Sequence, residues 1–377
     1  METETLDADE VQRLAAVRIA PFVQLGGAAR VHRPLLAELA AMGLLAPFFP
    51  KEFGGTGDGS FSATLLSSCR EGLARVSTEA STALAIQIGG IYVAVRHAGD
   101  DARRQWIPPV VRGEAVAAVA LTEPEVGSDL AAMAMPAVRA PGGWRLSGTK
   151  VWIMKAPEAD IYTVFARTSG TKGPRGITAF LVPGDSPGLS GEAIEAMWPD
   201  RVGRLFFDGV FVPDSHVIGN VDDGFRLGMG IFDVFRPSVG AHVVGLSQAA
   251  LDASVRYAKQ RRAFGQEIGM FQAVSHLLAD MAARLEAARL LVYHAAGAYD
   301  SGLATRQTQS SSSMAKLFAT ETAQFVVDSA LQIHGAVALE RGHLLEQLYR
   351  EVRASRIYEG TSEIQREIIA RHLLAEG

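Results

Sequence analysis

The spacing of apolar residues changes twice along this chain of 377 residues, and these changes limit the folds open to it. From about residue 8 to 116, apolar side chains recur at the three- and four-residue intervals of amphipathic helices. From about 117 to 220 they gather in short β-branched and aromatic runs separated by Gly, Pro and Asp, as in strands and turns. From 224 onward the helical spacing returns over long segments. The sequence therefore predicts helices, then sheet, then helices.

We expect a mainly α protein with a central β domain. An N-terminal α-helical domain would span 1–116, a middle antiparallel β domain 117–222, and a C-terminal four-helix bundle 223–377. The Gly-rich run at 54–59 follows no β-rich strand, so we interpret it as a surface turn and not as a dinucleotide-binding loop. Three glycines are interpreted as helix ends: Gly265, Gly335 and Gly360.

Composition excludes several classes of protein. With 48% hydrophobic and 20% charged residues the chain can bury a large core, and a net charge of −5 without a basic run argues against nucleic acid as a partner. The single cysteine, Cys69, rules out an intrachain disulfide and favours a reducing compartment.

The acidic N-terminus does not resemble a signal peptide, and the uncharged stretch 80–95 is too short and polar for a membrane span. We expect a cytoplasmic protein without a membrane partner. Its 30 Arg against 6 Lys suggest a GC-rich bacterial genome.

No metal or nucleophile motif stands out. The nine histidines form no paired metal-binding motif, and neither a nucleophile elbow nor a phosphate-binding loop is present. Two polar segments remain. In the first, at 122–129, a loop ending in Gly-Ser-Asp can present N–H groups and hydroxyls to an anion at a helix start. A capped turn leading into the β domain is the simpler interpretation from composition alone.

The second segment, at 356–366, predicts a helix-to-helix corner. Gly360 can end the preceding helix, and Ser362 with Gln365 forms a capping-box pattern for the next one. Glu359 lies at this corner. Partial burial would raise its pKa and suit it to act as a general base, whereas a solvated corner carboxylate would have no such role. The residues alone leave both interpretations open.

At these residues the chain resembles the acyl-CoA dehydrogenase family of flavoproteins, over essentially its whole length. The resemblance rests on five motifs in the family's order. They are Thr-Glu-Pro-Glu-Val-Gly-Ser-Asp at 122–129, Gly-Thr-Lys-Val-Trp-Ile at 148–153, Arg-Arg-Ala-Phe-Gly at 261–265 with Phe-Gln at 271–272, Gln-Ile-His-Gly at 332–335, and Ile-Tyr-Glu-Gly-Thr-Ser-Glu-Ile-Gln-Arg at 357–366.

The resemblance implies FAD as cofactor, bound between the β domain and the helices and completed by a second subunit of a homotetramer. Thr122 would lie near the flavin ring, Gly127 and Ser128 near the pyrophosphate, and Trp152 against the flavin. The residues implied to reach a neighbouring subunit's FAD are Arg261, Phe264, Gln332 and Gly335, while Thr361 and Glu363 would lie near the cofactor as well.

The chemistry implied by the resemblance is α,β-desaturation of an acyl thioester. Glu359 would remove the α proton while a hydride leaves the β carbon for the flavin, and the Glu359 N–H would help to hold the thioester oxygen. Some relatives carry their base at an earlier position, which is Phe235 here, so Glu359 is the candidate base. Electron-transfer flavoprotein is the implied electron acceptor.

The chain departs from the family pattern at three places. Met154 and Lys155 replace a hydroxyl residue and Asn, Ala336 and Ala338 replace glycines, and Met-Trp-Pro-Asp-Arg-Val at 197–202 replaces a Ser/Thr-rich stretch. Because the 197–202 stretch differs, the acyl group could be carried by an acyl carrier protein in place of coenzyme A. Met154 motivates an oxygen-using flavin oxidase or monooxygenase as an alternative, and Ala336 with the 197–202 stretch motivates a non-catalytic scaffold.

Overall fold

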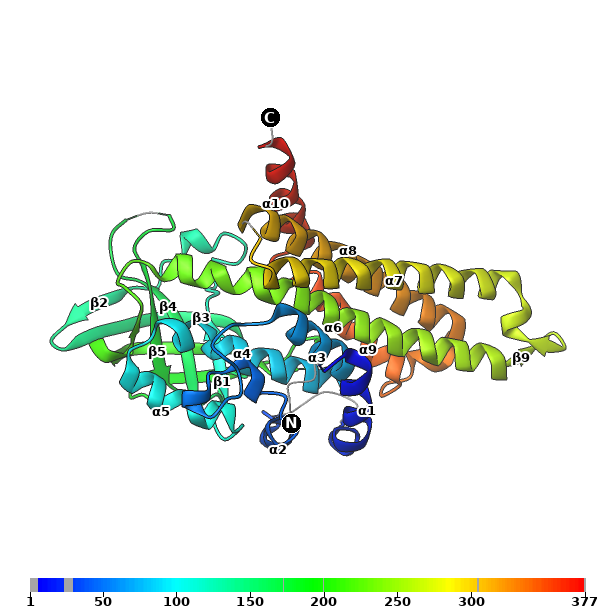
Figure 1. The fold of residues 1–377 in the computed structure, drawn as a ribbon, viewed down its shortest axis with the longest axis horizontal. Coiled ribbons are helices and arrows are strands. Elements are labelled where there is room, and N and C mark those ends of the chain that lie inside the picture. Colours follow the sequence, from blue (N-terminus) through cyan, green and yellow to red (C-terminus); the bar gives the residue numbers. More distant parts are fainter. Residues whose placement is uncertain (1–5, 24–29, 172, 199, 304, 376–377) are drawn as a thin grey trace.

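The structure is a computed structural model that describes residues 6–23, 30–171, 173–198, 200–303 and 305–375. N-terminal helices and two β-sheets occupy one end of the molecule, and long helices extend from them to the other end (Figure 1). The predicted order of helices, sheet and helices is confirmed.

The N-terminal helices are α1 (Ala8–Arg18), α2 (Arg33–Ala41), α3 (Ala63–Ala74), α4 (Thr78–His97) and α5 (Asp100–Val111). Ser62 and Ser77 cap α3 and α4, their side chains accepting N–H bonds from Leu65 and Ala80. Within the described residues α4 alone is long and apolar enough to cross a membrane, yet 89% of its most apolar window is buried inside the fold. It is the central helix of this region.

Eight strands form two four-stranded sheets in the middle of the chain. They are β1 (Ala117–Ala120), β2 (Ala137–Ala140), β3 (Gly143–Met154), β4 (Ile161–Arg167), β5 (Ile177–Pro183), β6 (Leu189–Ile194), β7 (Val202–Pro213) and β8 (Val217–Ile218). The sheet orders are β1-β4-β5-β8 and β2-β3-β7-β6. Among the described residues, the neighbouring strands of these two sheets pair antiparallel, as expected, except for the parallel pair β1–β4. The chain leaves the first sheet after β1, builds β2 and β3 in the second, and re-enters beside β1 in the same direction.

The C-terminal part contains α6 (Gly224–Gln260), α7 (Gln272–Asp300), α8 (Thr305–His334), α9 (Leu344–Ser355) and α10 (Ser362–Leu374). The hairpin β9 (Arg262–Ala263) and β10 (Gln266–Glu267) joins α6 to α7. Gly335, with φ of 68°, directly follows α8, as predicted. The interpretation of Gly265 as a helix end is wrong: α6 stops at Gln260, and Gly265 (φ 84°) lies in the hairpin turn.

Helix α6 passes through both cores of the molecule. Its first part contributes Leu227, Val234 and Phe235 to a core shared with the N-terminal helices and the sheets. Its later part contributes residues such as Val243 and Leu246 to the core of the bundle. A second link comes from Asp300 at the end of α7, whose carboxylate accepts the first N–H groups of α3.

The contact of α4 with β1 depends on Gly90. A Cβ at this position would lie 2.5 Å from the backbone nitrogen of Ala118, so helix and strand would have to separate. We predict that Gly90→Ala lowers the free energy of unfolding by about 1–3 kcal/mol through overpacking. The control is Gly297→Ala in α7, where nothing lies within 4 Å and alanine should stabilise the helix by roughly 0.5–1 kcal/mol. Equal effects of the two substitutions in urea unfolding would contradict this account.

Candidate functional site

Glu359 lies in the turn between α9 and α10, with a backbone φ of 52°. Such a positive φ is unfavourable for a residue with a side chain and is often found at functional sites. The cap of α10 differs from the predicted capping box. Thr361 is the N-cap and accepts the N–H of Ile364 at 3.3 Å, while Ser362 donates to Glu321 at 2.6 Å. The predicted helix-to-helix corner is present, with a different residue as its cap. The interpretation of Gly360 as a helix end is wrong: α9 stops at Ser355, and Gly360 (φ 90°) lies in the turn that follows.

The carboxylate of Glu359 is buried among cations from three helices. Burial raises its pKa, and the charges of Arg70 (α3), Lys316 (α8) and Arg236 (α6) each lower it. Its Oε2 atom is buried and makes no hydrogen bond within the described part of the chain. The interpretation as a solvated corner carboxylate is therefore wrong. A buried carboxylate with a raised pKa and a free oxygen is suited to accept a proton.

Polar side chains hold the backbone of this turn. The Lys316 ammonium, fully buried, donates to the carbonyl of Gly360 at 2.8 Å, and Gln365 donates to the same carbonyl at 2.9 Å. Burial lowers the pKa of Lys316 to about 8, although Glu359 favours its charged form. The turn is thus fixed from two helices, α8 and α10.

The 122–129 segment approaches β3. The Val151 N–H donates to the carbonyl of Thr122 at 3.0 Å, which brings Thr122 beside Trp152. The Trp152 ring is 58% exposed on a residue with φ of 59°. Gly127 and Ser128 are exposed, and among the described residues neither donates its N–H to another group. These four predicted residues therefore lie in one region of the β domain.

This segment does not start an α-helix. Only a short 3-10 turn, Leu130–Ala132, follows it. Its anchor is Glu123, whose carboxylate accepts from the buried ammonium of Lys150 at 2.9 Å and from the N–H groups of Ala134 and Met135. Burial lowers the pKa of Lys150 to about 8. The backbone of the 122–129 segment is therefore a turn. The N–H groups of Gly127 and Ser128 have no partner among the described residues, so they could still bind an anion.

The remaining predicted cofactor residues divide between two distant regions. Thr361 and Glu363 lie at the start of α10, close to Glu359. Arg261 and Phe264 lie in the hairpin beyond α6, and the Phe264 ring is 95% exposed. Gln332 and Gly335 lie near that hairpin too, since the ring of neighbouring His334 stacks on Tyr257 of α6 at 4.3 Å.

The length of α6 separates the hairpin from the β domain. Its 37 residues span roughly 55 Å, and Figure 1 shows β9 at the opposite end of the molecule from the sheets. One copy of the chain therefore cannot bring Trp152 and Phe264 to the same small molecule.

Two of the three departures from the family pattern form one buried unit. Lys155 and Asp200 make an ion pair at 2.8 Å, each almost fully buried. Trp198 donates to Glu351 at 2.6 Å, and its ring stacks on that of Tyr358 at 5.2 Å. Burial raises the pKa of Glu351 to about 8. The 197–202 stretch thus packs against the residue before Glu359; its Pro199 lies outside the described residues.

The third departure concerns Ala336 and Ala338, which follow Gly335. Ala336 is exposed, whereas Ala338 is buried in the core of the bundle. A contact of Ala336 with a cofactor therefore depends on what covers this surface.

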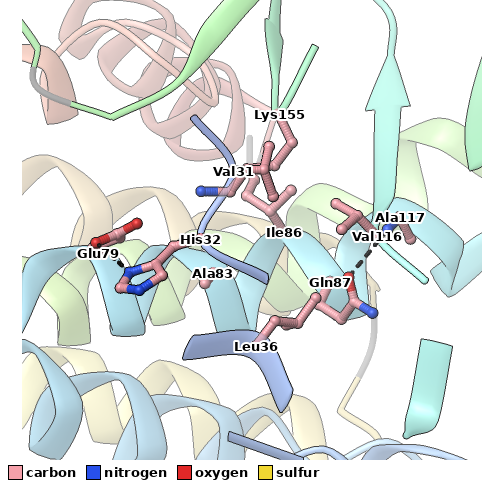
Figure 2. Close-up of a pocket in the computed structure, with 10 residues that line it drawn as sticks. All are labelled: Val31, His32, Leu36, Glu79, Ala83, Ile86, Gln87, Val116, Ala117 and Lys155. Atoms are coloured by element: carbon pink, nitrogen blue, oxygen red, sulfur yellow. Dashed lines mark hydrogen bonds and ion pairs between the residues drawn. The ribbon is translucent and has the colours of Figure 1, made fainter. Parts of the chain in front are cut away.

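A small cavity lies close to the buried unit (Figure 2). It is lined by α4, by the segment before α2, by β1 and by Lys155. His32 and Glu79 face each other across it at 3.4 Å, while Gln87 binds the N–H of Ala117 at 3.0 Å. None of the predicted site residues lines this cavity, and its polar residues His32, Glu79 and Gln87 already have partners, so we do not assign it to the candidate site.

The cations around Glu359 are functional residues that no sequence motif predicted. Lys316 is an isolated charge among uncharged neighbours such as Ala315, and Arg70, followed directly by Glu71, lies in a helix whose other residues are mostly small or apolar. A charged residue at an inward-facing position of a predicted helix is unusual, and this could have marked both residues as functional. Its connection with Glu359 required the packing of three helices.

Comparison with known proteins covers nearly the whole chain. Three family models match in order: "Acyl-CoA dehydrogenase, N-terminal domain" at 1–114, "middle domain" at 118–210 and "C-terminal domain" at 222–374. Cyclohexane-1-carbonyl-CoA dehydrogenase of Geobacter metallireducens is 33% identical, over 98% of this chain and 96% of the relative.

Two solved structures are similar throughout. Butyryl-CoA dehydrogenase from Megasphaera elsdenii superimposes with a TM-score of 0.90 at 30% identity and covers 99% of both chains. The FAD complex of PigA gives a TM-score of 0.87 at 30% identity, covering 98% of this chain and 95% of that one.

The Lys155–Asp200 pair yields a stability prediction. Asp200→Leu leaves an unpaired buried ammonium and should lower the free energy of unfolding by about 3–5 kcal/mol. Adding Lys155→Met should recover most of that loss. As a control, Glu192→Ala breaks the exposed Glu192–Arg204 pair and should cost less than about 1 kcal/mol. A double variant as unstable as Asp200→Leu in urea unfolding would show that the pair's charges are not the cause.

Proposed function

This chain belongs to the acyl-CoA dehydrogenase family and is an FAD-dependent oxidoreductase, and we propose that Glu359 is the base that removes the α proton of its acyl thioester substrate. The observation that carries the proposal is the buried, unpartnered Oε2 atom of Glu359. Burial raises the pKa of this carboxyl, which brings the base closer to the strength needed near neutral pH.

The backbone of Glu359 supports the same proposal. Among the described residues its N–H donates to no carbonyl or side chain. A free N–H beside the base can bind the thioester oxygen and stabilise the negative charge that develops as the α proton leaves. One such donor contributes about 3–4 kcal/mol in known oxyanion holes. Lys316 and Gln365, which both donate to the carbonyl of Gly360, hold the turn that carries this N–H.

The β domain has features that fit FAD. The exposed Trp152 ring offers a flat apolar surface, Thr122 lies beside it, and Gly127 has open space where a Cβ would be. The free N–H groups of Gly127 and Ser128 suit a pyrophosphate. When bound there, FAD supplies an acceptor for the hydride that leaves the β carbon. Thr361 and Glu363, near Glu359, would border the same cofactor.

The distant residues fit a second subunit's cofactor. We propose that Arg261, Phe264, Gln332 and Gly335 complete the FAD site of a neighbouring copy in a homo-oligomer, most simply a tetramer. The exposed Phe264 ring and the length of α6 support this arrangement. An Arg261→Ala variant that bound FAD with undiminished affinity would overturn it.

We favour coenzyme A over an acyl carrier protein as the thioester's carrier. The 197–202 stretch had suggested a carrier protein, but Trp198 and Asp200 are directed inward, toward Glu351 and Lys155. Faster turnover of the carrier-protein thioester than of the matched CoA thioester would reverse this choice.

Electron-transfer flavoprotein is the proposed acceptor of the electrons. The alternative of an oxygen-using flavin oxidase or monooxygenase rests on Met154, which replaces the family's hydroxyl residue. Rapid reoxidation of the reduced enzyme by air would support it.

Removal of the base gives the direct test. We predict that Glu359→Gln lowers the rate of flavin reduction by acyl-CoA by a factor on the order of 10² or more, while FAD and thioester still bind. The measurement is anaerobic bleaching of the flavin absorbance in a stopped-flow instrument. Glu340→Gln, at an exposed site, is the matched control. Wild-type rates in Glu359→Gln would assign the base to another residue.

The cation on α8 yields a pH prediction. Lys316 lowers the pKa of Glu359, so Lys316→Met should raise that pKa further. Because the base must be ionised, flavin reduction in this variant should fall off at a higher pH than in the wild type. Lys51→Met, at an exposed site, should leave the profile unchanged. An acid limb at the wild-type position or at lower pH would exclude this electrostatic role of Lys316.

A further inference from the structure

Two guanidinium groups near Glu359 lack a carboxylate partner. Arg70 is 3% exposed and Arg236 is 8% exposed. In the part of the chain that the structure describes, no ion pair includes either residue, and the Nε atom of each is buried without a hydrogen bond. Buried charges are normally paired, because an unpaired one loses its hydration without compensation.

The side chains that hydrogen-bond to Arg70 are polar but uncharged. Its Nη1 donates to the hydroxyl of Ser238 at 3.0 Å, and its carbonyl accepts from Ser81 at 2.9 Å. Ser81 also bonds Nδ1 of His242 at 2.8 Å. Burial and the Arg70 charge both lower the pKa of His242, so this imidazole stays neutral. This group orients Arg70 without balancing its charge.

The nearby acidic groups do not supply the missing charge. Asp233 lies close enough to interact with Arg236, and burial raises its pKa. The carboxylate of Glu359 interacts with both guanidiniums at longer range, but as the proposed base it takes up a proton during turnover. While Glu359 holds that proton, its carboxyl no longer offsets the charge of Arg70. An anion is therefore missing beside Arg70.

We propose that the acyl group of the substrate carries a carboxylate of its own, which binds the guanidinium of Arg70. The inference rests on the function proposed above and narrows its substrate to the monothioester of a short dicarboxylic acid. Arg70 is then a specificity-determining residue, held in place by Ser238. The acyl chain is short because Arg70 bonds Ser238 of α6, two residues after Arg236, and the charges of both guanidiniums act on the Glu359 carboxylate.

A plain aliphatic acyl group fits these surroundings poorly. Its end would provide no acceptor for the buried Nε, so this donor would stay unsatisfied in the complex. A carboxylate provides two acceptor oxygens and matches the planar donor group of arginine. The same reasoning predicts selection between two substrates of equal carbon number that differ only in the terminal group.

The test uses the FAD-loaded enzyme with glutaryl-CoA and pentanoyl-CoA, each of which has a five-carbon acyl chain. Anaerobic flavin reduction is recorded over a range of concentrations, so that apparent affinity and limiting rate are separated. We expect glutaryl-CoA to be preferred by about ten- to hundred-fold, the range of a hydrogen bond to a charged group. Arg70→Leu should remove this preference chiefly by weakening the apparent affinity for glutaryl-CoA.

Two further variants keep the test decisive if Arg70→Leu does not fold. Arg70→Lys retains the charge and should keep part of the preference, and Ser238→Ala should reduce it by releasing Nη1. Equal use of both thioesters by the wild type, or equal losses for both in every Arg70 variant, would overturn the inference while the proposed function stands. Flavin that neither thioester reduces would count against the proposed function itself.

Discussion

Burial of α6 in two successive cores is the constraint on which the rest of the structure depends. Its 37 residues leave the β domain, pack against α3 and α4, and continue as part of the bundle. This helix continues without a break through Pro237 to Gln260, so it fixes where the hairpin at its far end lies relative to the sheets. The separation of the proposed cofactor residues into two regions follows directly from this helix.

The same helix helps to build the charged surroundings of the base. Arg236 comes from α6, Arg70 from α3 and Lys316 from α8, and all three act on the carboxylate of one turn. Burial raises the pKa of Glu359 and the cations oppose that rise, so the final basicity reflects a balance of opposing effects. A site of this kind keeps a carboxylate buried and still able to ionise. It also creates an excess of positive charge that a neutral acyl chain would leave uncompensated.

The departures from the family pattern have different structural meanings. Lys155 and Asp200 are far apart in sequence but pair with each other, and Trp198 of the same stretch stacks on Tyr358. We interpret these residues as a buried contact next to the turn that carries Glu359, and not as a surface that binds an acyl carrier protein. Met154 pairs with Val202 across β3 and β7, beside this junction. Ala336, by contrast, is exposed on the surface of the described chain.

The sequence by itself determined the order of helices and strands, the turn that carries Glu359 and the motifs around Trp152 and Phe264, because periodicity, glycines and caps act over a few residues. It did not determine the parallel β1–β4 pair, the Thr361 cap or the role of Gly265. These depend on how the chain returns to a sheet and on which side chain reaches a free N–H group. The cations around Glu359 were decided by the tertiary structure alone. Arg70, Arg236 and Lys316 are separated by 80 or more residues from one another, and only the packing of α3, α6 and α8 brings their charges to one carboxylate.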